Sequence, residues 1–181
     1  MTDYQKLYAG ISRVAWGYFF LYFDINIGTV SVLPSFVGYL LFLSAIGHMK
    51  DEERELSLLR TLGIILTIWH TAQWGIRCFS VDLNGSWQFF DILIGLVNLY
   101  FHFQLITNIA SIAAKYQPPG YNLDLKLLRY RTLQTIMLTV VMIIAPLNTW
   151  LSWISIIIII IYLIAGICLM SVLFKLKKCF K

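Results

Sequence analysis

The sequence contains little charge for its length. Only 13% of the 181 residues are charged and 59% are hydrophobic, whereas soluble domains contain about 25% charged residues and about 45–50% apolar ones. A soluble fold of this size cannot bury so much apolar surface in a single core. The composition therefore excludes an ordinary soluble protein and predicts that most of the chain is surrounded by lipid.

Cysteine is also scarce, and the motifs of common enzyme classes are missing. Cys78, Cys168 and Cys179 form an odd number at scattered positions, which argues against a disulfide framework. No Gly-x-Ser-x-Gly, Walker loop, His-Glu-x-x-His or dinucleotide-binding glycine motif occurs, nor does a His-x-x-His or Glu-x-x-x-His spacing typical of metal sites. The sequence therefore predicts no catalytic residues and no cofactor, and it disfavours an enzyme.

Long apolar runs are what the sequence has in abundance. The run "ISIIIIIIYLIAGICLMSVLF" (154–174) contains no charge and is long enough to cross a hydrocarbon core of about 30 Å. The first run carries Arg13 and is followed by no cleavage site of a signal peptide, so we expect it to be retained as a helix. Six such segments are predicted, at about 7–23, 30–49, 56–79, 87–114, 127–147 and 150–174. They predict an all-α integral membrane protein: one polytopic domain of six transmembrane helices in three antiparallel hairpins.

The basic residues orient these helices. Of the 14 lysines and arginines, all except Arg77 lie at or near the two ends of the chain or the second and fourth connections. Because cytoplasmic loops are rich in lysine and arginine, both termini are predicted to be cytoplasmic, and the protein is predicted to be a multi-pass protein of the plasma membrane. The net charge of +5 is then a topology signal, and no nucleic-acid partner is expected.

Polar or aromatic side chains recur at helical spacing along one side of the third and fourth predicted helices. In chain order they are His70, Gln73, Trp74, Arg77, Asp91, Asn98 and His102. A tight turn near Asn84 joins the two helices, so residues equidistant from the turn meet at equal depth. The sequence thus predicts an outer Arg77–Asp91 ion pair, for which Asp24 of the first helix is a competing carboxylate, and a deeper layer in which His70 faces Asn98.

These eight residues, with Asp24 included, are the candidate ligand-binding set, and the pattern leaves several interpretations open. The side chains can simply hold the two helices together, they can line a polar cavity for a small solute, or they can serve a proton or a metal ion. The corresponding functions are a solute-binding transporter or transporter subunit, a non-catalytic interaction, assembly, sensor or immunity-type protein, and a membrane enzyme that uses His70 or His102. The expected partners are the lipid bilayer, a membrane protein or a second copy of the chain, and a small solute.

The size, the six predicted helices and the cytoplasmic termini are similar to those of the substrate-capturing membrane subunits of energy-coupling-factor vitamin transporters. This resemblance implies a solute site that opens outward and a partner that supplies energy. The Ala-x-x-x-Ala pattern which that family carries on its first helix is absent, since Gly10 and Gly17 have a different spacing.

Overall fold

The computed structural model describes residues 3–23, 26–27, 30–31, 34–78, 88–144 and 152–181. Over these residues the chain forms six long helices and a two-stranded hairpin. The helices are α1 (Tyr4–Tyr22), α2 (Ser35–Met49), α3 (Leu56–Cys78), α4 (Gln88–Tyr116), α5 (Leu123–Ile144) and α6 (Ser152–Lys177), which the 3-10 helix η2 (Lys178–Phe180) extends. The strands β1 (Asn26–Ile27) and β2 (Val30–Ser31) pair antiparallel between α1 and α2.

Local chemistry explains where three of the helices begin. Asp3 caps α1 by accepting a hydrogen bond from the amide of Lys6 at 3.2 Å, as N-cap residues do. The second helix starts at Ser35, not at residue 30 as the apolar pattern predicts, because Val30 is paired in β2 and Pro34 lies at the N-cap. The fifth helix starts four residues earlier than predicted, and the Gln117 side chain accepts a hydrogen bond from the amide of Leu123 at 2.6 Å.

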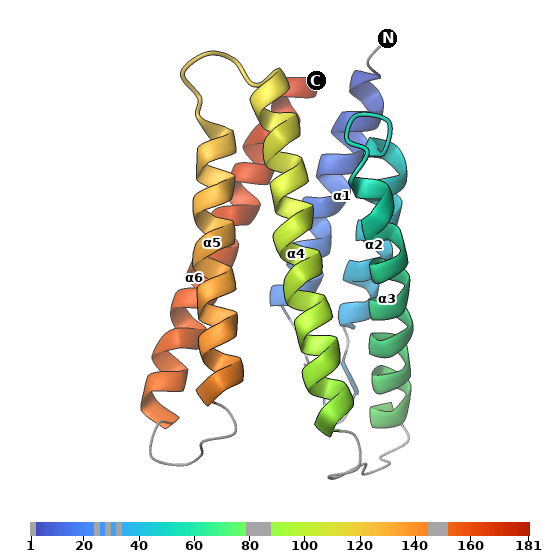
Figure 1. Ribbon diagram of the computed structural model, residues 1–181, viewed down its shortest axis with the longest axis vertical. Coiled ribbons are helices and arrows are strands. Elements are labelled where there is room, and N and C mark those ends of the chain that lie inside the picture. Colours follow the sequence, from blue (N-terminus) through green and yellow to red (C-terminus); the bar gives the residue numbers. More distant parts are fainter. Residues whose placement is uncertain (1–2, 24–25, 28–29, 32–33, 79–87, 145–151) are drawn as a thin grey trace.

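The six helices form one elongated bundle (Figure 1) in which each helix packs against the helices before and after it, and α6 returns to pack against α1. Both chain termini lie at the same end of the bundle, called the terminal end below. Where α1 and α2 cross, Gly17 and Gly38 allow close approach: a Cβ added to Gly17 would lie 2.5 Å from Cε1 of Phe42 and 3.0 Å from the carbonyl oxygen of Gly38.

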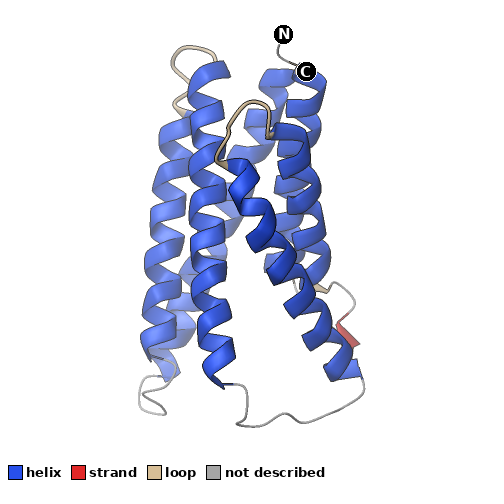
Figure 2. Cartoon of the chain, turned by 45° about the vertical axis from the view of Figure 1, so that its right-hand side comes forward, coloured by secondary structure: helices blue, strands red, loops and turns tan. Residues whose placement is uncertain are grey.

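Buried side chains are concentrated at the terminal end. In α3 the buried residues end at Leu66, and in α4 they begin at Phe101; the described residues 67–76 and 90–100 include none. Figure 2 shows α3 and α4 diverging toward the opposite end, and among the described residues they pack less extensively than the other consecutive pairs of helices. The bundle is therefore tightly packed where the termini lie and looser at the far end.

Two helical segments among the described residues, Phe90–Tyr116 and Ile156–Phe180, are long and apolar enough to cross a membrane. The Ser35–Met49 helix is apolar but shorter. The far half of α6 exposes isoleucines, among them Ile156, Ile157 and Ile160, each at least half exposed in the isolated chain. The prediction of six long helices is confirmed among the described residues. Association with a membrane is supported by these two segments.

Candidate functional site

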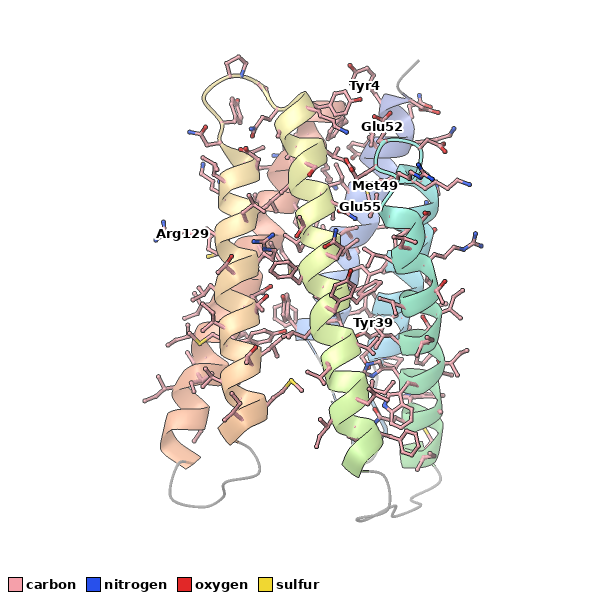
Figure 3. All side chains as sticks on the ribbon, in the orientation of Figure 1. Tyr4, Tyr39, Met49, Glu52, Glu55 and Arg129 are labelled. Carbon is pink, nitrogen blue, oxygen red and sulfur yellow. The ribbon has the colours of Figure 1, made fainter. Side chains whose placement is uncertain are left out.

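A buried tyrosine of α2 connects the polar residues of α3 and α4. Tyr39 is fully buried between these helices (Figure 3), and its hydroxyl donates a hydrogen bond to Oδ1 of Asn98 at 2.6 Å. The same hydroxyl lies 3.5 Å from Nε2 of His102. Its ring stacks on the imidazole of His70, with 4.7 Å between centroids and 10° between planes. His70 and Asn98 therefore occupy one layer, as predicted, but they meet through Tyr39.

Both ring nitrogens of His102 lie within hydrogen-bond distance of a tyrosine hydroxyl. A neutral imidazole has one donor and one acceptor nitrogen, and the single hydroxyl proton of Tyr39 is directed to Asn98. A His102 tautomer protonated at Nε2 is consistent with this arrangement, since Nε2 lies 3.5 Å from the Tyr39 oxygen. Nδ1 then accepts from the Tyr18 hydroxyl, 3.1 Å away on α1. The result is a directed series of hydrogen bonds from Tyr18 through His102 and Tyr39 to Asn98, drawn from α1, α2 and α4.

A second set of polar contacts lies nearer the far end of α3 and α4. The amide of Gln73 donates to Oδ1 of Asp91 at 3.2 Å, and Asp91 is exposed. Trp74 packs edge-to-face on Phe36 of α2, with centroids 5.6 Å apart. The Ser35 hydroxyl, at the start of α2, lies 3.4 Å from Nδ1 of His70.

The structure thus brings six of the eight predicted residues to the region between α2, α3 and α4: His70, Gln73, Trp74, Asp91, Asn98 and His102. Arg77 belongs to α3, but its side chain lies outside the described part of the chain, and so does Asp24. The predicted ion pair with Asp91 therefore stays a prediction. Within the described residues, the partner of Asp91 on α3 is Gln73.

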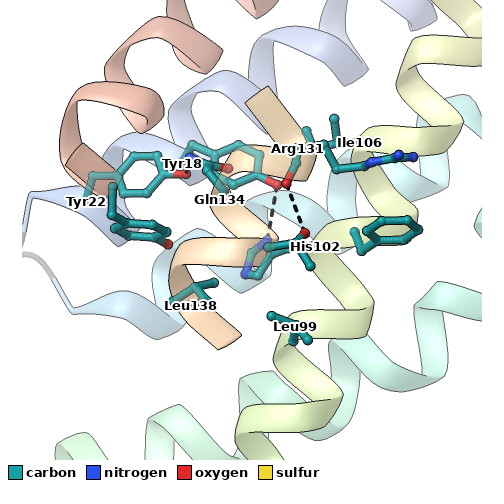
Figure 4. A pocket seen from close by; sticks show the side chains of 11 residues that line it. Tyr18, Tyr22, Leu99, His102, Ile106, Arg131, Gln134 and Leu138 are labelled. Carbon is teal, nitrogen blue, oxygen red and sulfur yellow. Dashed lines mark hydrogen bonds between the residues drawn. The ribbon is translucent and has the colours of Figure 1, made fainter. Parts of the chain in front are cut away.

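On the other side of His102 a small cavity lies between α1, α4, α5 and α6 (Figure 4). Its volume is about 20 Å³, and its lining includes Tyr18, Tyr22, His102 and Gln134. Gln134 is buried and donates a hydrogen bond to the Tyr22 hydroxyl. Since a cavity needs about 10–15 Å³ to hold one water, this space accommodates a single water and excludes a larger solute.

Arg131 lies along the edge of that cavity. Its Nη1 donates to Oγ1 of Thr107 at 2.7 Å, and its guanidinium carbon lies 4.0 Å from the centre of the Phe103 ring. Arg131 forms no ion pair with any described residue. The aromatic face and the hydroxyl together hold the charge between α4 and α5, in the way expected of a cation–π contact.

Sequence reasoning missed the tyrosines and the glutamine that complete this layer: Tyr18, Tyr22, Tyr39 and Gln134. Tyr18 and Tyr22 are four residues apart and stack at 5.7 Å, and this helical spacing was the available signal. Tyr39 carries no such signal, because only the packing of α2 against α3 and α4 makes it central. Among the described residues, no three His, Cys, Asp or Glu side chains lie close enough together to hold a metal ion.

Comparison with known proteins returned no similar protein. No family model, no curated protein and no solved structure matches the chain. The resemblance to energy-coupling-factor subunits therefore rests on size and predicted topology alone.

Proposed function

We propose that the chain is a six-helix integral protein of the plasma membrane with both termini in the cytoplasm. Two segments long enough to span a membrane, and exposed isoleucines on α6, support a lipid environment. Both termini lie at one end of the bundle, and the second and fourth connections, which hold basic residues, lead back to that end. This placement agrees with the positive-inside rule.

Within this membrane the protein binds a small polar solute, alone or as a subunit of a transporter. The observation that carries this proposal is that the far halves of α3 and α4 contain no buried residue among those described and yet hold polar side chains. In the proposed orientation a membrane would surround these side chains. Polar side chains at membrane depth are costly and mark functional sites. We call these polar residues of α2, α3 and α4 the proposed solute path: Gln73 and Asp91 lie at its outer end, and Tyr39, Asn98 and His102 lie deeper.

The far halves of α3 and α4 present a solute with both a hydrogen-bond acceptor and an aromatic surface. The exposed carboxylate of Asp91 accepts hydrogen bonds from a cationic or hydroxyl group, while Trp74 supplies an aromatic surface. The sequence carries no nucleotide-binding motif, so transport of the solute would draw on a partner protein or an ion gradient.

Asp91→Asn tests the proposal, with Glu55→Gln as the matched control. Both carboxylates are exposed and accept a hydrogen bond from a glutamine amide that joins the α3 and α4 sides of the bundle: Gln73 for Asp91 at 3.2 Å, and Gln104 for Glu55 at 2.6 Å. They lie at opposite ends of the bundle, so only Asp91 adjoins the proposed solute path.

The measurement is native mass spectrometry of protein extracted gently from its own membrane. We expect wild type and Glu55→Gln to retain a small molecule, and Asp91→Asn to retain it about 10-fold less or worse, since hydrogen bonds to charged groups contribute about 1.5–3 kcal/mol. Equal thermal unfolding of the two variants shows that folding is unchanged. Retention by Asp91→Asn equal to that of wild type, or a wild type without any small molecule, contradicts the proposal.

A second candidate is a non-catalytic membrane interaction protein in which the polar layer only stabilises the bundle. It is favoured by the mutual hydrogen bonding of Tyr18, His102, Tyr39 and Asn98 and by a cavity that holds no more than one water. A stoichiometric protein partner in the same mass spectrum, without a small molecule, supports this alternative.

A further inference from the structure

A groove at the terminal end runs between α2 and α3 and is separate from the solute path. Its volume is about 550 Å³, within the range of about 300–1,000 Å³ typical of ligand sites. Leu43, Ile46 and Ile64 give it apolar walls, and Lys50 and Arg60 lie at its rim. The groove therefore combines an apolar surface with two cations.

The cations of the groove are not neutralised by the described residues. Lys50 and Arg60 are both exposed, and neither forms an ion pair there. Ser44 and Ser57 add hydroxyl groups to the same lining. The Ser57 hydroxyl donates to the carbonyl oxygen of Arg54 at 2.8 Å. An anionic group at this rim would therefore meet two positive charges and the hydroxyl of Ser44.

Three of the four acidic residues of the neighbouring α2–α3 connection contact α4, and the fourth, Asp51, is exposed next to Lys50. Glu52 accepts a hydrogen bond from the Tyr116 hydroxyl at 2.6 Å, and Glu53 pairs with Lys115 at 3.1 Å. Glu55, as described above, accepts from Gln104. These three carboxylates therefore lie on the α4 side, whereas Lys50 lies beside the groove.

A glycine opens the middle of the groove. A Cβ added to Gly47 would meet no atom within 4 Å, so the surface of α2 is bare at this position. The wall formed by Leu43 and Ile64 continues past it toward the centre of the bundle. A hydrocarbon chain can lie along this surface in van der Waals contact with its apolar walls.

We propose that this groove binds one anionic phospholipid of the cytoplasmic leaflet, with its phosphate between Lys50 and Arg60 and an acyl chain along Leu43, Gly47 and Ile64. The assignment rests on the membrane orientation in the proposed function, which places the terminal end at the cytoplasmic surface. The apolar walls favour a lipid over a free phosphate, because a free phosphate has no apolar group to contact them. Clusters of basic residues at that leaflet recognise anionic lipids.

Two pairs of variants test the charged and the apolar contacts separately. Lys50→Gln with Arg60→Gln removes the charges of the rim, and its control is Lys178→Gln with Lys181→Gln, which removes two exposed charges outside the groove at the terminal end. Gly47→Leu fills the groove, and its control is Gly75→Leu, another helical glycine whose added Cβ would meet nothing within 4 Å.

The measurement is native mass spectrometry after reconstitution in nanodiscs of equal parts phosphatidylglycerol and phosphatidylcholine. We expect wild type and both controls to retain one phosphatidylglycerol in preference to phosphatidylcholine. The rim variant is expected to retain it about 30-fold less, because each basic residue near an anionic surface contributes roughly 1 kcal/mol. Gly47→Leu is expected to lose the retained lipid with the rim charges intact.

Equal retention by the rim variant and wild type overturns the proposal, and so does wild-type retention of both lipids without preference. An acidic protein or free phosphate retained in place of the lipid overturns it as well. Resistance of the wild-type chain to carbonate extraction from native membranes is measured in parallel. A chain that is extracted contradicts the membrane placement itself, whereas an integral chain without lipid preference contradicts the groove assignment alone.

Discussion

At the scale of single residues, Tyr39 links the polar side chains of α3 and α4 in the centre of the bundle. Its ring is fully buried against His70, and its hydroxyl reaches Asn98 on the opposite helix. Tyr39→Phe keeps the ring and removes only the hydroxyl. We expect the free energy of unfolding to fall by about 0.5–1.5 kcal/mol, the usual net contribution of one hydrogen bond, because Oδ1 of Asn98 loses its donor. Thermal unfolding in detergent measures the change.

Tyr100→Phe is the control for that substitution, because Tyr100 lies two residues from Asn98 on the same helix and is 56% exposed. It should change the unfolding free energy by less than about 0.5 kcal/mol. If the two variants unfold alike, the Tyr39 hydroxyl does not stabilise the layer.

At the scale of elements, the crossing of α1 and α2 depends on two glycines. Gly17→Ala places a methyl group against the Phe42 ring and the backbone of Gly38, and backbone cannot move aside as a flexible side chain does. We expect a loss of about 1–3 kcal/mol in unfolding free energy, the usual cost of overpacking. Thermal unfolding again provides the measurement.

The matched substitution Gly75→Ala in α3 meets no neighbour within 4 Å. It should raise the unfolding free energy by about 0.5–1 kcal/mol, because alanine favours a helix over glycine. If Gly17→Ala left the unfolding free energy unchanged while Gly75→Ala lowered it, α1 and α2 would not approach closely at Gly17.

The start of α5 supplies a prediction about pH. The Gln117 amide donates to Oδ1 of Asp124 at 2.7 Å, and this hydrogen bond lowers the pKa of the Asp124 carboxyl below its usual value. A lowered pKa in the folded chain adds stability above the unfolded pKa of about 3.9, and that stability is lost as the pH falls through the folded pKa. Gln117→Ala should therefore raise the pKa of Asp124 toward the usual value.

Carboxyl carbon chemical shifts in an NMR titration measure that pKa. Asp3 serves as the internal control, since the backbone amide of Lys6 is the main group that lowers its pKa and α1 does not involve Gln117. An Asp124 pKa that is the same in both proteins would contradict the capping role of Gln117.

At the scale of the whole molecule, the proposed membrane orientation predicts which surfaces face the cell exterior. In a chain with Cys78, Cys168 and Cys179 replaced by serine, a single cysteine is introduced by Asp51→Cys or by Gly85→Cys. An impermeant thiol reagent should label Gly85→Cys, in the predicted outer turn, on intact cells. It should label Asp51→Cys only after the cells are permeabilised, because the α2–α3 connection lies at the terminal end. Equal labelling of both on intact cells contradicts the orientation.

Much of the fold follows from the sequence, because apolar runs and turns are local properties of the chain. The six helices agree with the apolar segments, and the even number of helices brings both ends to one side. The start of α2 was wrong by five residues because apolar content does not distinguish Val30 in a strand from Val30 in a helix, whereas Pro34 limits where the helix begins. The number of helices that cross the membrane stays a prediction.

The candidate site shows the same division between local and tertiary information. Periodicity alone placed His70, Asn98 and His102 on facing sides of α3 and α4, since residues of one helix keep their spacing in any fold. Only the tertiary structure decided that Tyr39 and Tyr18 stand between them, because the contact of α1 and α2 with α4 depends on packing between distant parts of the chain. The tertiary structure likewise decided that Glu52 and Glu53 contact Tyr116 and Lys115 of α4 and form no ion pair with Lys50. The sequence by itself determined the helices and their polar faces; the tertiary structure determined which faces meet, because that choice depends on shape and hydrogen bonding among residues far apart in the chain.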